Sequence, residues 1–135
     1  MRHAVRTPLI LLTLLLLGGC LTSGASIAPA SASLPPAALS LRGTLPRATG
    51  IQLSGRAEQG ALGAQYQALQ FGSVGQAVPW SADGFHGEVV PTQLYRIGSQ
   101  ECRGYTHTVS KGGASARQVG TACRASDNAS WTPVS

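Results

Sequence analysis

The sequence predicts an α+β domain in which one short N-terminal helix packs on a four- to five-stranded antiparallel meander sheet, braced by one disulfide. Three observations predict it. Apolar residues recur at helical spacing between residues 54 and 71, short alternating runs separated by turn residues follow from residue 76, and two cysteines lie in neighbouring runs. The length of 135 residues allows one small domain, and the 11% content of charged residues argues against disorder of the whole chain.

The helix is expected from Ser54, which can serve as its N-cap, to Phe71. Leu62, Tyr66 and Leu69 recur at spacings of four and three residues, which places them on one stripe of a helix. Three glycines in the segment weaken the helix by up to about 1 kcal/mol each. We expect the stripe to face the core rather than a ligand or a partner.

The expected strands are short and separated by turn residues. Pro79 places the first strand at an edge of the sheet, and Pro91 predicts a bulge or an edge position within the second. The sequence Asp83-Gly84 is a turn signal between these two strands. The expected strands cover residues 76–81, 87–96, 101–110, 114–124 and 131–134.

The two cysteines of the sheet test the predicted hairpin. A two-residue primed turn at Gly112-Gly113 sets a register in which Cys102 faces Cys123, in a non-hydrogen-bonded pair with Cα atoms roughly 4.5 Å apart. That distance suits a disulfide, which would stabilise the domain by roughly 3 kcal/mol. The same register places Tyr105 across from Gly120. A redox pair or a metal site stays open as an alternative, although zinc would need two further ligands.

The N-terminus has the organisation of an export signal. Arg2, His3 and Arg6 precede a nearly unbroken apolar run over residues 9–17, which small residues follow. The run is too short to cross a bilayer, because a transmembrane helix needs roughly 20 apolar residues. Residues 1–19 are therefore predicted to be a signal peptide.

The sequence Leu17-Gly18-Gly19-Cys20 resembles the lipobox of bacterial lipoproteins. The resemblance implies that the chain is cut before Cys20 and that the thiol of Cys20 carries diacylglycerol. This lipid would anchor the protein to a membrane. Under the lipoprotein sorting rule, an Asp directly after the lipidated cysteine would keep the protein from the outer membrane. This chain has Leu21 at that position, which implies the outer membrane. A plain secretory signal with a chance cysteine and an uncleaved anchor are the alternatives.

Ser, Thr, Pro, Ala and Gly make up 22 of the 30 residues from 21 to 50. Such a segment cannot bury enough apolar surface to fold alone. We expect residues 20–50 to be a lipidated cysteine with a flexible tether, and residues 51–135 to be the folded domain.

Several segments of the expected domain resemble the bacterial seventeen-kilodalton outer-membrane surface antigen family, over about 85 of the 135 residues. The resemblance implies a lipoprotein exposed at the outer membrane, on its periplasmic or surface side, with no known enzymatic activity. Many members carry a glycine-zipper segment ahead of this domain, where this chain has the Ser/Ala/Pro-rich tether. The segments that carry the resemblance are residues 71–80 (FGSVGQAVPW), 87–91 (GEVVP), 102–109 (CRGYTHTV) and 120–124 (GTACR), followed by Trp131.

Few residues point to catalysis. Asp83 and His86 lie near one turn, but a Ser/His/Asp site needs three converging groups, and an ordinary polar turn explains the pair better. His107 falls on the same strand face as Arg103 and Tyr105, a face that can equally be solvated. No phosphate-binding loop, dinucleotide-binding or zinc-protease motif is present. We expect no catalytic residue, cofactor or metal ion.

The net charge of +5 falls to +3 once the signal is removed, because eight Lys and Arg then face five Asp and Glu. Five basic residues fall in the expected sheet: Arg96, Arg103, Lys111, Arg117 and Arg124. They either form a basic face toward anionic lipid headgroups or envelope polymers, or are scattered solubilising residues. Nucleic-acid binding is disfavoured by the expected location.

Together these features predict an outer-membrane lipoprotein with a structural, assembly or surface-interaction role in the cell envelope and no catalysis. Its expected partners are the membrane through the lipid on Cys20, another envelope protein or an anionic envelope polymer. The alternatives are a small inhibitor or ligand-binding lipoprotein, for example of a muramidase, and an enzyme acting through His86 or His107.

Overall fold

The computed structural model describes residues 33–134 of the chain. The predicted signal peptide, Cys20 and the first part of the predicted tether lie outside the described residues. The helices are α1 (Pro36–Leu39), a 3-10 turn (Arg42–Thr44) and α2 (Gly55–Phe71). The strands are β1 (Val78–Ala82), β2 (Phe85–Ile97), β3 (Gln100–Lys111), β4 (Ala114–Arg124) and β5 (Trp131–Val134). No helix among these is long and apolar enough to span a bilayer.

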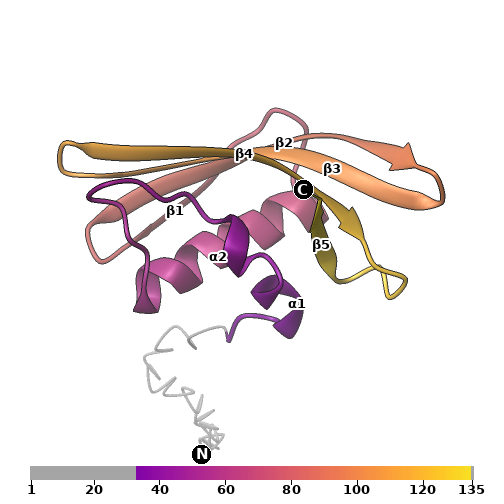
Figure 1. Ribbon diagram of the computed structural model, residues 1–135, viewed down its shortest axis with the longest axis horizontal. Coiled ribbons are helices and arrows are strands. Elements are labelled where there is room, and N and C mark those ends of the chain that lie inside the picture. Colours follow the sequence, from indigo (N-terminus) through magenta and orange to yellow (C-terminus); the bar gives the residue numbers. More distant parts are fainter. Residues whose placement is uncertain (1–32, 135) are drawn as a thin grey trace, which may run out of the picture. The chain divides into compact units, whose positions relative to one another are not determined.

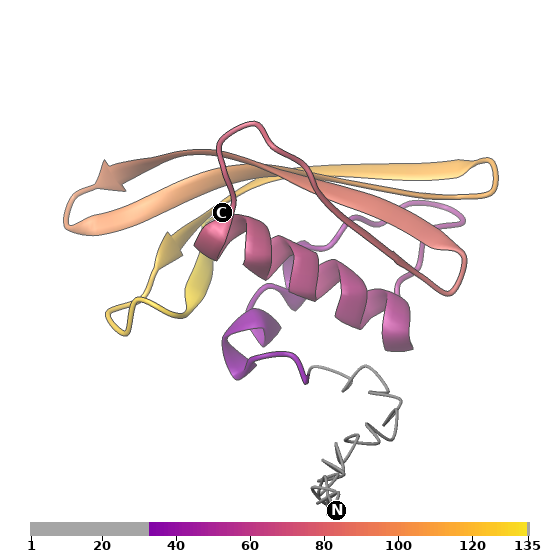
Figure 2. The same cartoon turned by 180° about the vertical axis from the view of Figure 1, so that it is seen from behind.

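The five strands form one antiparallel sheet in the order β1-β2-β3-β4-β5, and α2 lies against one face of it (Figures 1 and 2). The predicted fold class and the edge position of β1 are confirmed. Asp83, Gly84, Gly98 and Gly112 have positive φ in the tight turns that join successive strands, because primed hairpin turns require that conformation. Both views show the sheet extending beyond the two ends of α2.

Helix α2 covers the predicted segment, and Ser54 takes the extended N-cap conformation without a side-chain cap bond. Leu62 and Leu69 are fully buried, as the apolar stripe predicts. On the face toward the sheet, Gly60 leaves room for the ring of Trp80, since a Cβ added at this glycine would lie 3.1 Å from the indole. The helix glycine therefore allows an aromatic side chain of β1 to pack closely.

The predicted irregularity at Pro91 is a β-bulge. Pro91 faces Tyr105, but the next pair is Leu94 with Arg103, so two residues of β2 lie opposite Gly104 of β3. Such a bulge bends the strand and strengthens its local twist. It also directs the carbonyl of Thr92 toward Arg103.

The prediction of a loose tether is wrong for the residues from 36 to 50. Ala38 and Leu41 are fully buried, Leu45 is 6% exposed, and the Ser40 hydroxyl donates to the Trp131 carbonyl over 2.8 Å. The Ser/Ala/Pro-rich composition led to the wrong expectation, because this segment does not need to form a core of its own. Its few leucines pack on a surface that α2 and β5 already provide, so the folded unit begins near residue 33.

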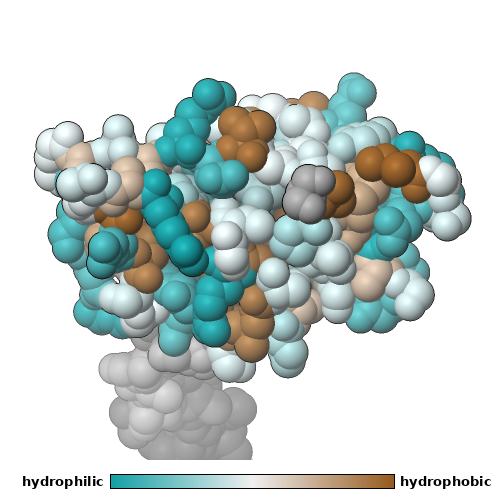
Figure 3. Space-filling model, in the orientation of Figure 1, coloured by the Kyte–Doolittle hydropathy of each residue, from teal (hydrophilic) through white to brown (hydrophobic). Residues whose placement is uncertain are grey.

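The core lies between α2 and the sheet. A larger cluster surrounds Leu62 and Trp131, and a smaller one surrounds Phe85 and Val109 near the β1–β2 turn. On the face seen in Figure 3, apolar side chains form small separate groups between polar ones.

Candidate functional site

The disulfide between Cys102 and Cys123 is present in the predicted register, with Cα atoms 3.9 Å apart. It lies on the face of the sheet opposite α2, since side chains alternate along β3 and those of Tyr105 and His107 face the helix side. Tyr95 is the cross-strand neighbour of Cys102 on this face. Cys102 is fully buried and Cys123 is 4% exposed, which makes the bond a structural one.

Tyr105 faces Gly120, as the register predicts. A Cβ added at Gly120 would lie 2.5 Å from the Tyr105 hydroxyl oxygen, so the phenol ring covers the glycine closely. Burial raises the pKa of Tyr105, and the side chains of Thr44 and Gln65 partly offset this effect. This aromatic side chain therefore fills the sheet surface between β3, β4 and the segment before α2.

His107 is fully buried between the sheet and α2 and has a partner on each ring nitrogen. The indole N–H of Trp80 lies 2.9 Å from Nε2, and Oε1 of Gln65 lies 2.8 Å from Nδ1. Because the indole can only donate, Nε2 must accept, and Nδ1 therefore carries the proton that it donates to Gln65. The amide of Gln65 in turn donates to Thr44 over 2.7 Å.

This chain of hydrogen bonds holds His107 in its neutral form. Desolvation by burial lowers the pKa of His107 from 6.5 to about 4. A neutral imidazole with both nitrogens occupied has neither a lone pair nor a proton free for a substrate. No local sequence pattern predicts these contacts, because Gln65 and His107 lie 42 residues apart.

The other candidate histidine lies elsewhere. His86 is exposed and faces Ser110 on the sheet side opposite His107. The carboxylate of Asp83 accepts from Arg56 over 2.7 Å, so Asp83 forms an ion pair with Arg56 rather than a contact with His86. The structure therefore does not bring the sequence-derived candidates for acid and base chemistry together.

Arg103 is 5% exposed, and its guanidinium binds four backbone carbonyls. Nη1 donates to Ala68 (3.2 Å) and Leu69 (3.1 Å), Nη2 to Gly72 (2.6 Å), and Nε to Thr92 in the bulge (2.7 Å). Three of these carbonyls lie at the C-terminal end of α2, where a positive charge also meets the negative end of the helix dipole. The Ala68 carbonyl also accepts from the Gly72 N–H. Arg103 thus joins the end of α2 to the sheet.

The five basic residues of the sheet do not form one face. Arg103 is buried, and the side-chain alternation places Arg117 on the side opposite α2. The ammonium of Lys111 lies 4.4 Å from the centre of the Phe85 ring at the far end of the sheet. Arg96 and Arg124 lie near each other, because both line one cavity, and the charge of Arg124 also reaches Arg103.

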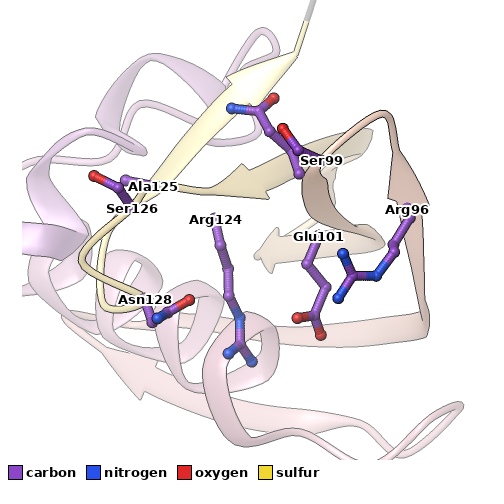
Figure 4. A pocket seen from close by; sticks show the side chains of 8 residues that line it. Arg96, Ser99, Glu101, Arg124, Ala125, Ser126 and Asn128 are labelled. Carbon is purple, nitrogen blue, oxygen red and sulfur yellow. The ribbon is translucent and has the colours of Figure 1, made fainter.

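That cavity has a volume of about 330 Å³ and is lined mostly by polar residues (Figure 4). One wall comes from the β2–β3 hairpin and carries Arg96 and Glu101, and the other comes from Arg124 and the β4–β5 loop. The sequence offered no signal for this site, since the residues come from two separate turns. Within residues 33–134, no group of three or more His, Cys, Asp or Glu side chains is placed to hold a metal ion.

These observations define the class as a small, disulfide-braced α+β domain whose buried polar side chains tie a helix to a sheet. Over 71 residues, half of the chain, it is 38% identical to two Rickettsia bellii proteins named "17 kDa surface antigen", one of them from strain RML369-C. The match covers 44% of each relative, so the chain spans less than half of the relatives' length. The resemblance to this family is confirmed at that level. No family model and no solved structure matches the chain.

Proposed function

We propose that this protein is a lipoprotein of the outer membrane that acts in the cell envelope by binding or structural contact rather than by catalysis. The lipobox-like sequence ending at Cys20 supports the anchor. The similarity to proteins named surface antigen supports a location in the envelope or at the surface.

One observation carries the non-catalytic part of the proposal. His107, which is the most deeply buried ionisable group on the helix side of β3, uses both ring nitrogens to join Trp80 of β1 and Gln65 of α2. Its role is to hold the layers together. The disulfide and the Arg103 bonds to the end of α2 serve the same purpose, as suits a stable module that is displayed or that contacts a partner.

The anchor is tested by replacing its cysteine. Cys20→Ala should abolish incorporation of labelled palmitate and move the protein out of the outer-membrane fraction of a density gradient, because no thiol remains to be lipidated. The matched control is the Cys102→Ala/Cys123→Ala double variant, which keeps Cys20 and should retain the label. Unchanged fractionation of the Cys20→Ala protein would overturn the anchor.

A second candidate is a ligand-binding or inhibitory lipoprotein, for example one directed at a muramidase. The polar cavity between the β2–β3 hairpin and the β4–β5 loop favours it. Adding the purified protein to a muramidase assay tests the inhibitory form. Full muramidase activity at a large excess of the protein would exclude that form.

A further inference from the structure

The cavity between the two turns is built by an overhang of the sheet. The β2–β3 hairpin extends beyond the end of α2, and the β4–β5 loop curves back beneath it on the same side (Figures 1 and 2). Arg96 faces Glu101 across this hairpin, and both side chains point to the helix side of the sheet, as Arg103 does two residues further along β3. The volume of about 330 Å³ lies at the lower end of the roughly 300–1,000 Å³ typical of small-molecule sites.

Arg124 supplies a positive group that is held in place but has no hydrogen-bond acceptor within residues 33–134. Its guanidinium lies 5.2 Å from the centre of the Trp131 ring, within the range of a cation–π contact. Its Nε is buried and has no hydrogen-bond partner among the described residues. A buried donor without a partner costs about 1–3 kcal/mol, and none of the hydrogen bonds within residues 33–134 uses the Arg124 guanidinium.

Asp127 forms no ion pair with Arg124. Both carboxylate oxygens of Asp127 accept bonds within its own loop, from the backbone of Ala129 and from the backbone and hydroxyl of Ser130. Arg103 is bound only to neutral carbonyls and keeps its charge. Burial lowers the pKa of Arg103, and the positive charge of Arg124 lowers it further. This end of the cavity therefore has two guanidinium groups, those of Arg103 and Arg124, and neither forms an ion pair within residues 33–134.

The opposite wall carries one negative group, Glu101, whose cross-strand neighbour is Arg96. Glu101 is half-buried and forms no ion pair or hydrogen bond within residues 33–134. Figure 4 shows its carboxylate beside the cavity, between the side chains of Arg96 and Arg124. A simple anion bound to Arg124 would lie near this carboxylate and be repelled, whereas a ligand that also carries a cation would satisfy both walls.

We propose that this cavity binds the zwitterionic group of an amino acid, with its carboxylate on Arg124 and its ammonium on Glu101. A guanidinium binds a carboxylate through two parallel N–H donors, which suits the unpartnered donors of Arg124. The amide of Asn128, on the same wall, supplies a further polar contact. The amino acid is either free or part of a polymer that leaves both groups unmodified. This inference does not depend on the lipid anchor.

The test is a calorimetric titration of the full-length protein in detergent with alanine as the probe. Alaninamide lacks the carboxylate and N-acetylalanine lacks the ammonium charge, so each should bind at least tenfold more weakly than alanine. Equal binding of N-acetylalanine and alanine would reveal a simple anion site and overturn the proposal, as would no binding of alanine. Tighter binding of Nε-acetyl-lysine than of alanine indicates a polymer-borne amino acid, and the reverse indicates a free one.

Substitutions locate the binding on the two walls. Glu101→Gln should weaken the binding of alanine at least tenfold, because the partner of the ammonium group is lost. The same change should tighten the binding of N-acetylalanine, because the carboxylate that repels it is removed. Arg124→Gln should weaken the binding of both alanine and N-acetylalanine. A thermal melt of this variant checks that loss of the Trp131 contact has not unfolded the domain. The control is Arg117→Gln on the opposite face, which should bind as the parent does. Glu101 forms no hydrogen bond or ion pair within residues 33–134, so Glu101→Gln should not disturb folding. An unchanged affinity of this variant for alanine would therefore refute the site.

Discussion

The indole N–H of Trp80 donates to Nε2 of His107 over 2.9 Å, and this bond leaves the imidazole without a free nitrogen because Gln65 holds Nδ1. One residue from β1, one from β3 and one from α2 are thereby joined in the interior. The network fixes how the helix sits on the sheet, and it ties the stability of the domain to the protonation of a single side chain.

Stability should fall in mild acid. The pKa of His107 is about 4 in the folded protein and about 6.5 when unfolded, so between these values the unfolded chain binds more protons. The free energy of unfolding should therefore be constant above about pH 6.5 and decrease by about 3 kcal/mol as the pH falls to 4. Urea denaturation at several pH values measures this.

The control for the acid effect is His86→Asn, which changes the exposed histidine and should keep the same pH dependence. His107→Gln should be less stable at neutral pH but lose most of the decrease between pH 6.5 and 4. Asp127 does not confound this range, because its backbone bonds lower its pKa from 3.8 and its effect falls below the window. A stability that is flat from pH 7 to 4 in the parent protein would contradict the network.

Replacing Arg103 should be severely destabilising. Arg103→Leu removes the side-chain donor from the carbonyls of Leu69, Gly72 and Thr92, at about 1–3 kcal/mol for each group that water cannot reach. The Ala68 carbonyl keeps its bond from the Gly72 N–H. We expect a loss of at least about 3 kcal/mol in urea denaturation. Arg103→Lys should recover only part of it, since an ammonium lacks the planar fork. Equal stability of Arg103→Lys and the parent protein would show that the fork geometry is unimportant.

Gly120 should tolerate no side chain. In Gly120→Ala the new methyl group would lie 2.5 Å from the Tyr105 hydroxyl oxygen, and the displacement of the ring should cost about 1–3 kcal/mol. Gly113→Ala is the matched control, because a Cβ there meets nothing within 4 Å. It should change the free energy of unfolding by no more than about 0.5 kcal/mol. Thermal melts of both variants compare the two sites, and similar melts would refute the packing of Tyr105 on Gly120.

The segment before α2 should contribute to stability. Leu41 is fully buried, so Leu41→Ala should cost about 2–5 kcal/mol, whereas Leu39→Ala, at a side chain 44% exposed, should cost about 0.5 kcal/mol or less. Urea denaturation of the two variants checks this. If Leu41→Ala were as stable as Leu39→Ala, the folded domain would begin after residue 50, as composition alone suggested.

Local sequence was sufficient for the sheet but not for what packs on it. The turn at Gly112-Gly113 determines the register of its hairpin, and the register in turn places Cys102 opposite Cys123. By contrast, the alternation along β3 assigns Arg103 and His107 to one face without saying whether that face is buried. This depends on α2, whose carbonyls and Gln65 meet β3 only after the chain has folded back over more than 30 residues.

The packing of the segment before α2 and the polar cavity were not predicted from the sequence, for the same reason. Leu41 and Leu45 lie in an Ala- and Pro-rich stretch that cannot fold alone, and only the finished helix and β5 give them a surface to pack on. Arg96 and Arg124 belong to different turns, and the overhang of the sheet brings them to one cavity. In each case the missing information was a long-range contact.

The most direct test of the account is the ¹⁵N NMR signature of His107 followed through a pH titration. The structure predicts a neutral imidazole protonated on Nδ1, with Nε2 accepting from Trp80, that titrates only near pH 4. An imidazole that titrates near 6.5, or that carries its neutral proton on Nε2, would contradict the buried hydrogen-bond chain and with it the structural role assigned to this histidine.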